Sequence, residues 1–455
     1  MADAGDFEVR TYRTVTWRLL PFLFLCYILA YLDRVNVGFA RLQMQADLHL
    51  SDTAYGIGAG MFFIGYFFFE VPSNLLLHRV GARMWIARIM IVWGLVSSAT
   101  MFTNSQTTFY VLRFLLGVAE AGFFPGIILY LTYWYTQAHR ARMVALFVTA
   151  IAFAGVLGGP VSGWIMERMG GVGGLRNWEW LYLLEGLPSV VVGVLVLFYL
   201  DDGPARASWL TDEQKALLAR RLAEEEAAKA ADGHQAHRAI DAFRTPAVWL
   251  LSLIYFGTVM GNYGVTFWLP QIISETITRN PWQIGLVSML PWGVAAVTAV
   301  LVGASSDRAQ ERRWHIATAA AVGAVAFGLS GLPGLSGWLG LACLTVATAG
   351  MLSALSTFWA LPTAMLSGRA AAAGIAWINS VGNLSGYVSP FVIGAIRDAT
   401  RDASHPNGNM FLALLVLAVS LLTASALTLI VTRPGLTTSR RKPEAGLKTG
   451  GYERL

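Results

Sequence analysis

The chain has 455 residues, of which 55% are hydrophobic and only 13% are charged, which is far more apolar than a water-soluble protein of average composition. Its net charge is +6 at pH 7, but no basic run is interleaved with aromatic residues, so a nucleic-acid-binding protein is not indicated. The composition therefore indicates an integral membrane protein.

Twelve apolar runs of about 20 residues follow one another, and each is long enough to cross about 30 Å of hydrocarbon. They lie near residues 17–40, 53–77, 84–104, 107–131, 143–166, 178–200, 246–273, 283–305, 314–334, 337–361, 370–396 and 409–432. The first run is too long for a signal-peptide core and no cleavage site follows it, so we expect it to remain as a span. The predicted fold class is an all-α membrane protein with twelve transmembrane helices.

The longest polar interruption falls near mid-sequence and leaves six spans on either side. We expect an N-terminal half at 1–200, a cytoplasmic linker at 201–245, a C-terminal half at 246–432 and a cytoplasmic tail at 433–455. Within the linker, SWLTDEQKALLARRLAEEEAAKA predicts an amphipathic helix, and Thr211 and Gln214 have the spacing of a capping box. Because one chain supplies both halves of a pathway, we expect a monomer.

Lysine and arginine are distributed unevenly between alternate loops. The segments on the side of both termini hold most of them, which predicts that both termini are cytoplasmic in a multi-pass protein of the inner membrane. The positive net charge then reflects topology and attraction to anionic lipid in the bilayer.

Two of the apolar runs each contain an acid and a base. Asp33 and Arg34 lie in the first, and Arg113 and Glu120 lie in the fourth. Ionisable groups are costly inside a bilayer, by roughly 2.5 to 3.5 kcal/mol each at a helix centre, so they indicate function by default. The structural alternative is that they form two buried salt bridges that fix helix register.

The two halves repeat each other at two places. The turn after the second span contains Arg79-Val-Gly-Ala-Arg83, and the turn after the eighth contains Gly-Ala-Ser-Ser-Asp307-Arg308. Glycines and a proline also recur in the fifth and eleventh spans, as Gly155-VLGG-Pro-VS-Gly163 and Gly386-YVS-Pro-FVI-Gly394. Small residues at these positions predict close helix approach.

The turns resemble the loop pattern Gly-x-x-x-Asp-Arg-x-Gly-Arg of the major facilitator superfamily. The second copy fits its first part, whereas the first has Asn74 and His78 where glycine and aspartate are usual. The resemblance implies that these turns act in gating; a basic turn that serves topology alone is the alternative. The candidate gating residues are Arg79, Arg83, Asp307 and Arg308.

The whole chain resembles the anion:cation symporter family of that superfamily, which includes permeases for tartrate, phthalate and sugar acids. The resemblance lies in YLDRVN from Tyr31, GYFFFEVPSNLLLHRVGAR from Gly65, RFLLGVAEAGFFPG from Arg113, WLYLLEGLP from Trp180, WALP from Trp359 and NSVGNLSGY from Asn379. In that family the acids at the positions of Asp33 and Glu120 carry protons, and the arginine at the position of Arg34 holds the substrate.

The chemistry of these residues agrees with the implied roles. An arginine offers a planar, permanently charged fork that matches a carboxylate, so Arg34 is the first candidate for the anion, and Tyr31 should share its helix face. Arg113 is an ion partner or a second anion contact. A carboxylate whose neighbouring arginine can move away can take up a proton, which fits Asp33 and Glu120 as proton-coupling groups.

Four further residues match pocket-lining positions of similar proteins: Tyr66, Ser356, Trp359 and Asn379. For each of them, packing or a hydrogen bond between helices is the alternative. Glu70 and Glu185 rank lower as proton carriers because neither has an arginine nearby in its own helix, and Glu70 suits a gate contact better. Tyr263 and Trp268 are weaker candidates still.

The sequence thus predicts proton-coupled uptake of a small organic carboxylate by alternating access, with an exchanger on the same fold as the alternative. Thr149 stands where sugar-acid permeases of the family tend to have an amide, which favours a short dicarboxylate or an aromatic acid. The histidines and the two cysteines have no metal-site spacing, so we expect no cofactor and no metal. No catalytic cluster indicates an enzyme.

Overall fold

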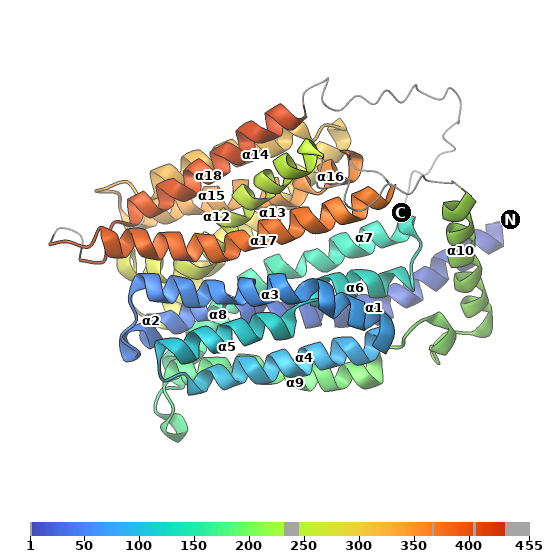
Figure 1. Cartoon of the computed structure of the whole chain (residues 1–455), viewed down its shortest axis with the longest axis horizontal. Coiled ribbons are helices and arrows are strands. Elements are labelled where there is room, and N and C mark those ends of the chain that lie inside the picture. The colour runs from blue at the N-terminus through green and yellow to red at the C-terminus, as the bar shows by residue number, and fades with distance from the viewer. Residues whose placement is uncertain (1, 232–244, 366–367, 404–405, 433–455) are drawn as a thin grey trace.

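The computed structural model describes residues 2–231, 245–365, 368–403 and 406–432, and within these ranges the regular structure is helical. The long helices run side by side along one axis and form an elongated bundle (Figure 1). Helices are expected here because a backbone in hydrocarbon must satisfy its own hydrogen bonds.

The first half consists of nine α-helices: α1 (Ala2–Val35), α2 (Val37–Asp47), α3 (Asp52–Val80), α4 (Ala82–Ala99), α5 (Gln106–Glu120), α6 (Phe123–Thr132), α7 (Gln137–Val148), α8 (Ala150–Arg168) and α9 (Asn177–Tyr199). Short 3₁₀ turns lie at Thr100–Phe102, Val172–Gly174 and Pro204–Arg206. The second half consists of α12 (Pro246–Thr276), α13 (Pro281–Ala309), α14 (Arg313–Ser330), α15 (Gly337–Phe358), α16 (Ala360–Met365), α17 (Gly368–Ala399) and α18 (Met410–Val431).

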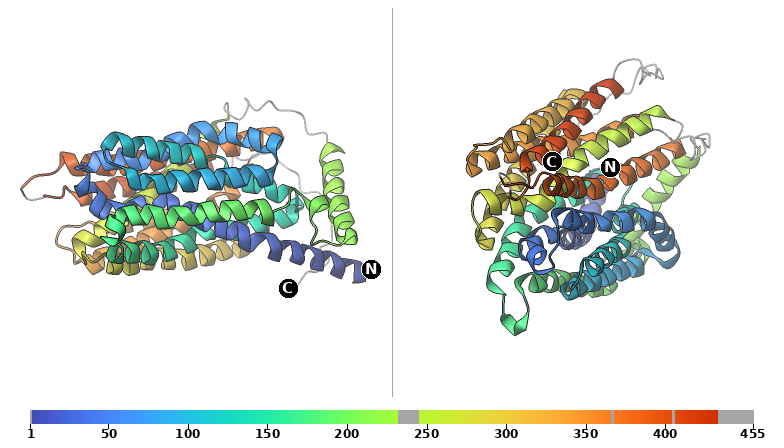
Figure 2. Two further views of the ribbon diagram at one scale, coloured as in Figure 1. Left: turned by 90° about the horizontal axis from the view of Figure 1, so that it is seen from below. Right: turned by 60° about the vertical axis from the view of Figure 1, so that its left-hand side comes forward.

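Ten segments of the described chain are long and apolar enough to cross a bilayer. Several of them join two consecutive helices, such as α1 with α2 and α5 with α6. Helices α14 and α17 lie beside them in the places of the predicted ninth and eleventh spans, which completes two sets of six (Figures 1 and 2). The predicted fold class is therefore confirmed.

The helix of the linker is α10 (Asp212–Ala231), which begins at the predicted capping box. The Thr211 backbone N–H donates to the Gln214 side chain at 3.1 Å, and the Gln214 backbone N–H donates to the Thr211 hydroxyl at 3.3 Å. The Arg221 guanidinium of α10 pairs with Glu8 near the start of α1 at 2.5 Å. This contact places α10 at the same end of the bundle as the N-terminus (Figure 2).

Several spans are interrupted part-way. The clearest break is at Ala121 and Gly122, where Gly122 has a left-handed φ of 87° and separates α5 from α6. A side chain at Gly122 would meet the Ser73 hydroxyl, because a Cβ there would lie 2.3 Å from it. Milder interruptions at Asn36 and Trp359, both with near-helical dihedral angles, separate α1 from α2 and α15 from α16. Interrupted helices near mid-membrane are typical of transporter binding sites.

The two halves meet along α3 with α17 and along α8 with α13, and glycines bring these helices together. A Cβ on Gly163 would lie 2.5 Å from the Pro281 carbonyl oxygen, and one on Gly285 would lie 2.2 Å from the Gly159 carbonyl oxygen. On the other seam, a Cβ on Gly394 would lie 2.2 Å from the Asp52 carbonyl oxygen. The predicted close approach at the repeated glycines is confirmed.

Candidate functional site

The centre of the candidate site is an ion pair between α1 and α5. Arg34 lies in the last turn of α1 and Glu120 is the last residue of α5, so both stand beside a helix interruption. The Arg34 Nη2 atom donates to Glu120 Oε1. The Glu120 side chain is 1% exposed and the Arg34 side chain 11% exposed, so the pair is almost wholly withdrawn from solvent.

Aromatic rings surround the Arg34 guanidinium. Its carbon lies 4.9 Å from the centre of the Phe62 ring and 5.6 Å from that of Tyr66, both on α3. Its Nη1 atom donates to the Tyr263 hydroxyl of α12 at 3.4 Å. These rings attract the cation through their faces. Arg34 is therefore contacted by residues of both halves. Tyr263, which the sequence analysis ranked as a weaker candidate, contacts Arg34 directly.

Arg113 lies beside this pair but is not part of it. Its Nη2 atom donates to the carbonyl oxygens of Arg34 and Ala59, both at 3.3 Å, whereas its Nε and Nη1 atoms have no partner. Within the described residues Arg113 makes no ion pair with a carboxylate, although it is completely buried. The ion pair thus joins the two charged runs instead of forming inside each of them, and Arg113 is a buried cation with unused donors.

Asp33 points away from Arg34, into the interior of the first half. Its carboxylate accepts hydrogen bonds from Trp93 Nε1 at 3.0 Å, Ser97 Oγ at 2.6 Å and Ser189 Oγ at 2.5 Å. These donors belong to α4 and α9, and Asp33 itself is completely buried. The neighbouring positions 33 and 34 therefore serve different environments, because adjacent residues lie about 100° apart around a helix.

The two lower-ranked acids also lie in buried surroundings. Glu70 on α3 accepts a hydrogen bond from Asn379 Nδ2 on α17 at 3.3 Å, so it links the two halves. Glu185 on α9 accepts one from Ser162 Oγ on α8 at 2.7 Å. In each acid the second oxygen has no partner.

The remaining predicted pocket residues lie in different settings. Tyr31 and Tyr66 are buried. Trp359 is half-buried and packs edge-on against Tyr255, with 4.8 Å between ring centres. Ser356 is exposed, and its hydroxyl donates to the Ser353 carbonyl of its own helix. Tyr31 and Tyr66 therefore lie near Arg34. The hydrogen bond of Ser356 stays within its own helix and does not connect Ser356 to Arg34.

The predicted gating turn of the first half docks on the start of the linker. The backbone N–H of Arg83 donates to Asp202 Oδ1 at 3.0 Å, and the open backbone of Gly81, at φ 96°, leaves room for this carboxylate. Asp202 thus supplies an acid near the turn that has His78 in place of aspartate. The side chain of Arg79 is exposed.

The turn of the second half closes on itself. Asp307 pairs with Arg312, whose Nη1 atom also donates to Ser306 Oγ at 2.8 Å. Arg308 is exposed. The contacts of this turn therefore stay within the second half.

A second charged cluster, missed by the sequence analysis, joins the halves at one end of the bundle. Asp52 of α3 pairs with Arg41 of α2 at 2.5 Å and with Arg397 of α17 at 2.9 Å. Arg397 also pairs with Glu275 of α12 at 2.6 Å. Arg41, Asp52 and Arg397 are each at most 2% exposed. We call these four residues the inter-half ion cluster.

Further contacts brace the inter-half ion cluster. The Trp268 ring lies under Arg41 at 3.8 Å and under Arg397 at 5.4 Å. The carboxylate of Asp398 accepts the backbone N–H of Thr53 at 2.7 Å, which ties the end of α17 to the start of α3. Helix α2 and the C-terminal end of α17 lie at the end of the bundle opposite the N-terminus (Figure 1). That end is therefore closed in this structure.

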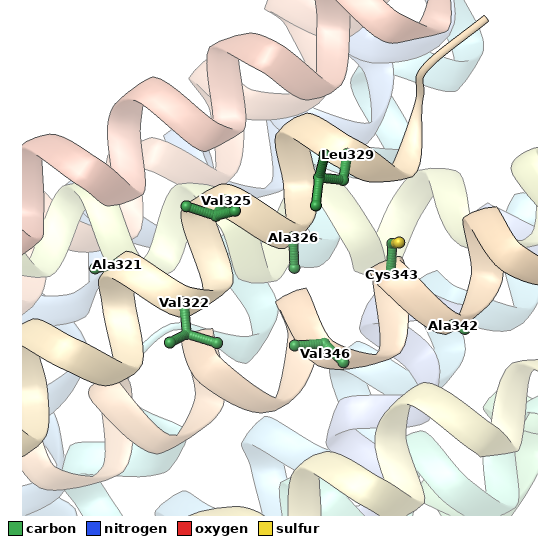
Figure 3. Close-up of a pocket in the computed structure, with 8 residues that line it drawn as sticks. All are labelled: Ala321, Val322, Val325, Ala326, Leu329, Ala342, Cys343 and Val346. Carbon is green, nitrogen blue, oxygen red and sulfur yellow. The ribbon is translucent and has the colours of Figure 1, made fainter. Parts of the chain in front are cut away.

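One cavity of the described structure is unrelated to these charges. It has a volume of about 520 Å³ and lies between α14 and α15 (Figure 3). All of its lining residues are apolar: Ala321, Val322, Val325, Ala326, Leu329, Ala342, Cys343 and Val346. Val322 and Val325 are more than half exposed, so the groove opens on the outer surface of the bundle. It suits a lipid chain and offers nothing to a carboxylate.

Comparisons with known proteins agree with this architecture. Residues 23–390 match the family model of the Major Facilitator Superfamily. A "Putative tartrate transporter" of Agrobacterium vitis is 46% identical over 92% of either chain, and the "Putative metabolite transport protein NicT" of Pseudomonas putida is 45% identical over 91% of this chain and 94% of its own. A solved bacterial homologue of the human lysosomal transporter Spinster, inward-facing and occupied, superposes with a TM-score of 0.75 at 17% identity and covers 95% of this chain and 99% of its own.

The family match spans most of the chain, and the relatives align over nearly their full length. Both named relatives are transport proteins. The chain therefore belongs to the major facilitator superfamily, as a multi-pass membrane protein that transports a small molecule and is not an enzyme.

Proposed function

We propose that the protein takes up a small organic carboxylate together with protons, and that Arg34 binds the carboxylate. The observation that carries this proposal is the buried pair of Arg34 with Glu120, held between the two halves by Tyr263. The Glu120 carboxylate accepts a hydrogen bond from the Arg34 guanidinium, so a substrate carboxylate would compete with Glu120 for the same donors.

Protonation of Glu120 would resolve this competition. A neutral carboxyl group holds the guanidinium far less strongly than a carboxylate does, so a proton on Glu120 releases Arg34 for the substrate. Glu120 Oε2 has no hydrogen-bond partner and is buried, so it is a free acceptor for that proton. Coupling then follows because substrate and proton favour the same state of the site.

Asp33 is the second proposed proton site. Its partners are two hydroxyl groups and an indole, all of them neutral. A proton could therefore be taken up there without breaking an ion pair. Because its contacts lie on α4 and α9, the link to Arg34 would run through the packing of α1 and not through a direct contact.

The inter-half ion cluster would act as one gate of an alternating-access cycle. It closes the end opposite the N-terminus, which is periplasmic if both termini are cytoplasmic in a bacterial inner membrane, as the loop charges predict. At the other end we assign gating contacts to Arg79, Arg83, Asp307 and Arg308, and a contact between the halves to Asn379 with Glu70. One chain contains both halves of this pathway, so we propose a monomer.

The other pocket residues have supporting roles in this proposal. Tyr66 lies 5.6 Å from the Arg34 guanidinium carbon and would steady it as substrate exchanges with Glu120. Arg113, with unused donors, would be a second contact for the anion. Ser356 and Trp359 would meet the substrate from the second half when the site opens. The name of the Agrobacterium relative agrees with a carboxylate substrate.

Uptake into proteoliposomes tests the proposal. An imposed inward proton gradient should drive accumulation of at least one radiolabelled hydroxy-dicarboxylic, aromatic or sugar acid, and a protonophore should abolish it. Glu120→Gln should remove the pH dependence, whereas Glu224→Gln, at an exposed pair on α10, should not change it. Rapid exchange without any response to the gradient would establish an exchanger instead, and unchanged pH dependence in Glu120→Gln would remove Glu120 from the mechanism.

A further inference from the structure

Glu185 is a buried acid of the first half that the proposed cycle does not use. It lies on α9, is 4% exposed, and accepts a hydrogen bond from Ser162 Oγ of α8 at 2.7 Å. The side chain of Asn36, at the interruption between α1 and α2, faces the same carboxyl group. Both neighbours are neutral, and among the described residues Glu185 pairs with no arginine or lysine. Glu185 therefore does not serve as half of an ion pair.

The charged group that acts on Glu185 from a neighbouring helix is Asp33 of α1. Ser189 lies one turn after Glu185 on α9, so the two side chains share a helix face. The Ser189 hydroxyl donates to Asp33 Oδ2 at 2.5 Å. A second negative charge beside Asp33 is unfavourable in a dry interior, so a proton that reaches either acid is stabilised there. Glu185 and Asp33 thus belong to one buried acidic region.

The other helices around Glu185 contribute neutral groups or distant charges. Helix α4 approaches this part of α9 with glycine and serine residues. The charged residues of α8 lie in its last turn. The titratable neighbour on α9 is Tyr182, and Arg113 of α5 acts on Tyr182 and is not among the groups that act on Glu185. The surroundings therefore leave Asp33 as the charged partner of Glu185.

Ser162 connects Glu185 to a cavity on the seam between the halves. The cavity has a volume of about 30 Å³, and its polar lining comes from Ser162 of α8, Tyr31 of α1, and Thr266 and Ser288 of the second half. It is large enough for a water molecule and offers that water polar partners. Ser162 thus has the Glu185 carboxyl group on one side and a space that water can enter on the other.

This connection lies toward the end of the bundle opposite the N-terminus. Ser162 is in the last third of α8 and Glu185 in the first half of α9, and the turn that joins these helices is at that end (Figure 1). Trp178, at the start of α9, donates to Asp47 at the end of α2 at 2.8 Å. This end is periplasmic in the proposed orientation, which is the side from which protons enter during uptake.

We propose that Glu185 is the proton-carrying residue through which Asp33 exchanges protons with the cavity on the seam. A cavity water gives a proton to Ser162 Oγ while the hydroxyl proton of Ser162 passes to Glu185, so Ser162 stays neutral and Glu185 loses its charge. The same exchange at Ser189 moves the proton on to Asp33, and Glu185 regains its charge as Asp33 loses its own. This inference rests on the proposed function and gives the completely buried Asp33, which does not line the cavity, a path for its proton.

Separate measurements of proton and substrate movement in proteoliposomes test the inference. Tartrate, phthalate and gluconate would be supplied as probes, and the acid that the native protein accumulates under an inward proton gradient would be used for the variants. A pH-sensitive dye inside the vesicles follows substrate-driven proton uptake, and radiolabelled acid follows exchange at equal pH on both sides. The variants are Glu185→Gln, Glu185→Asp and Ser162→Ala. The control is Glu179→Gln, because Glu179 caps the start of the same helix.

Glu185→Gln should retain exchange but lower the ratio of protons to substrate by about half, because one of the two proposed proton sites is cut off. Glu185→Asp keeps an ionisable group and should restore most of the ratio. Ser162→Ala should slow proton uptake by about tenfold or more and leave exchange unchanged. Glu179→Gln should match the native protein. Adding Glu185→Gln to Asp33→Asn should lower the ratio no further than Asp33→Asn alone, because both residues lie on one path.

Two results would overturn the inference while leaving the proposed function intact. One is a native ratio of protons to substrate in Glu185→Gln. The other is an equal loss of exchange in Glu185→Gln and Glu185→Asp together with proton uptake at the native rate in Ser162→Ala, which would make Glu185 a structural partner of Ser162. If the native protein takes up no protons with any of the three acids, the proposed function fails and the inference with it.

Discussion

Replacing Asp52 with asparagine should weaken the closed end of the transporter. Among the described residues, Asp52 is the acid that pairs with both Arg41 and Arg397, at 2.5 and 2.9 Å, and it joins residues of the two halves. Its removal leaves two buried guanidinium groups, of which Arg397 keeps Glu275 as a partner and Arg41 keeps no carboxylate among the described residues. Because the cluster joins the two halves at this end, we expect the loss to fall on the closed state.

Breaking a buried ion pair by removing one partner costs about 3 to 5 kcal/mol. The single amide oxygen of the asparagine can still accept the hydrogen bond from Arg397, so we take the lower value, about 3 kcal/mol. Each 1.4 kcal/mol is tenfold in an equilibrium, so the population open at this end should rise by about a hundredfold relative to the closed one.

Spin labels at two exposed turns of this end provide the assay. His49 lies in the first half and Arg279 in the second, and both are exposed. In a background without Cys26 and Cys343, Asp52→Asn should shift the distance distribution between labels at these positions toward longer values. Asp47→Asn is the matched control, because Asp47 lies at the same end but pairs within the first half, with Arg176 at 3.4 Å. An unchanged distribution in a folded Asp52→Asn protein would refute the reasoning.

Two further predictions concern the seam between the halves and a loop outside the membrane. Gly285→Val should abolish transport in the uptake assay, because even a Cβ at Gly285 would lie 2.2 Å from a carbonyl oxygen of α8. Gly303→Ala is the control and should transport normally, because a Cβ at Gly303 would have no atom within 4 Å. At the start of α14, burial acts to raise the pKa of Glu311, but hydrogen bonds from the Trp314 and His315 backbone and the His315 ring outweigh it and hold the pKa below its usual value of 4.5. Because the pKa of Glu311 is lower in the folded protein, the stabilisation by these hydrogen bonds is present above about pH 4.5 and is lost as the pH falls below it. The difference in melting temperature between the native protein and Glu311→Gln should therefore shrink as the pH falls below about 4.5.

The sequence predicted the parts of the structure that depend on local pattern. Apolar runs predicted the spans, the spacing of Thr211 and Gln214 predicted the start of α10, and the repeated glycines predicted close helix contacts. Each of these features is determined by residues that are near one another in the chain or by the absence of a side chain. The membrane strengthens such local signals because every span must satisfy its own backbone.

Partner choice between helices could not be predicted in the same way. Arg113 and Glu120 are spaced two turns apart and suggested a pair, but Glu120 ends α5 and meets Arg34 of α1 instead. Asp33 and Arg34 are adjacent and yet point into different surroundings. Which side chains meet depends on helix rotation and on interruptions such as the one after Glu120, and neither has a periodic signal.

The inter-half ion cluster was missed for a related reason. Arg41 and Arg397 each stand near the end of a span, where an arginine in the sequence indicates only topology. Their partners Asp52 and Glu275 lie near span ends as well, with one acid and one base in either half. A search for opposite charges near the same end of both halves would have found the cluster, because burial of one such charge requires a partner.

The charged residues around Arg34 also indicate how many negative charges the substrate carries. The guanidinium groups of Arg34 and Arg113 lie beside the single carboxylate of Glu120. The Asp33 carboxylate does not contribute to this balance, because it accepts hydrogen bonds from neutral donors in the interior of the first half. Once Glu120 is protonated, neither guanidinium has an ion-pair partner among the described residues. A dianion would then balance the site, whereas a monoanion would leave one buried guanidinium uncompensated, which is unfavourable in a dry interior. This charge balance favours a short dicarboxylate as the substrate of the proposed function.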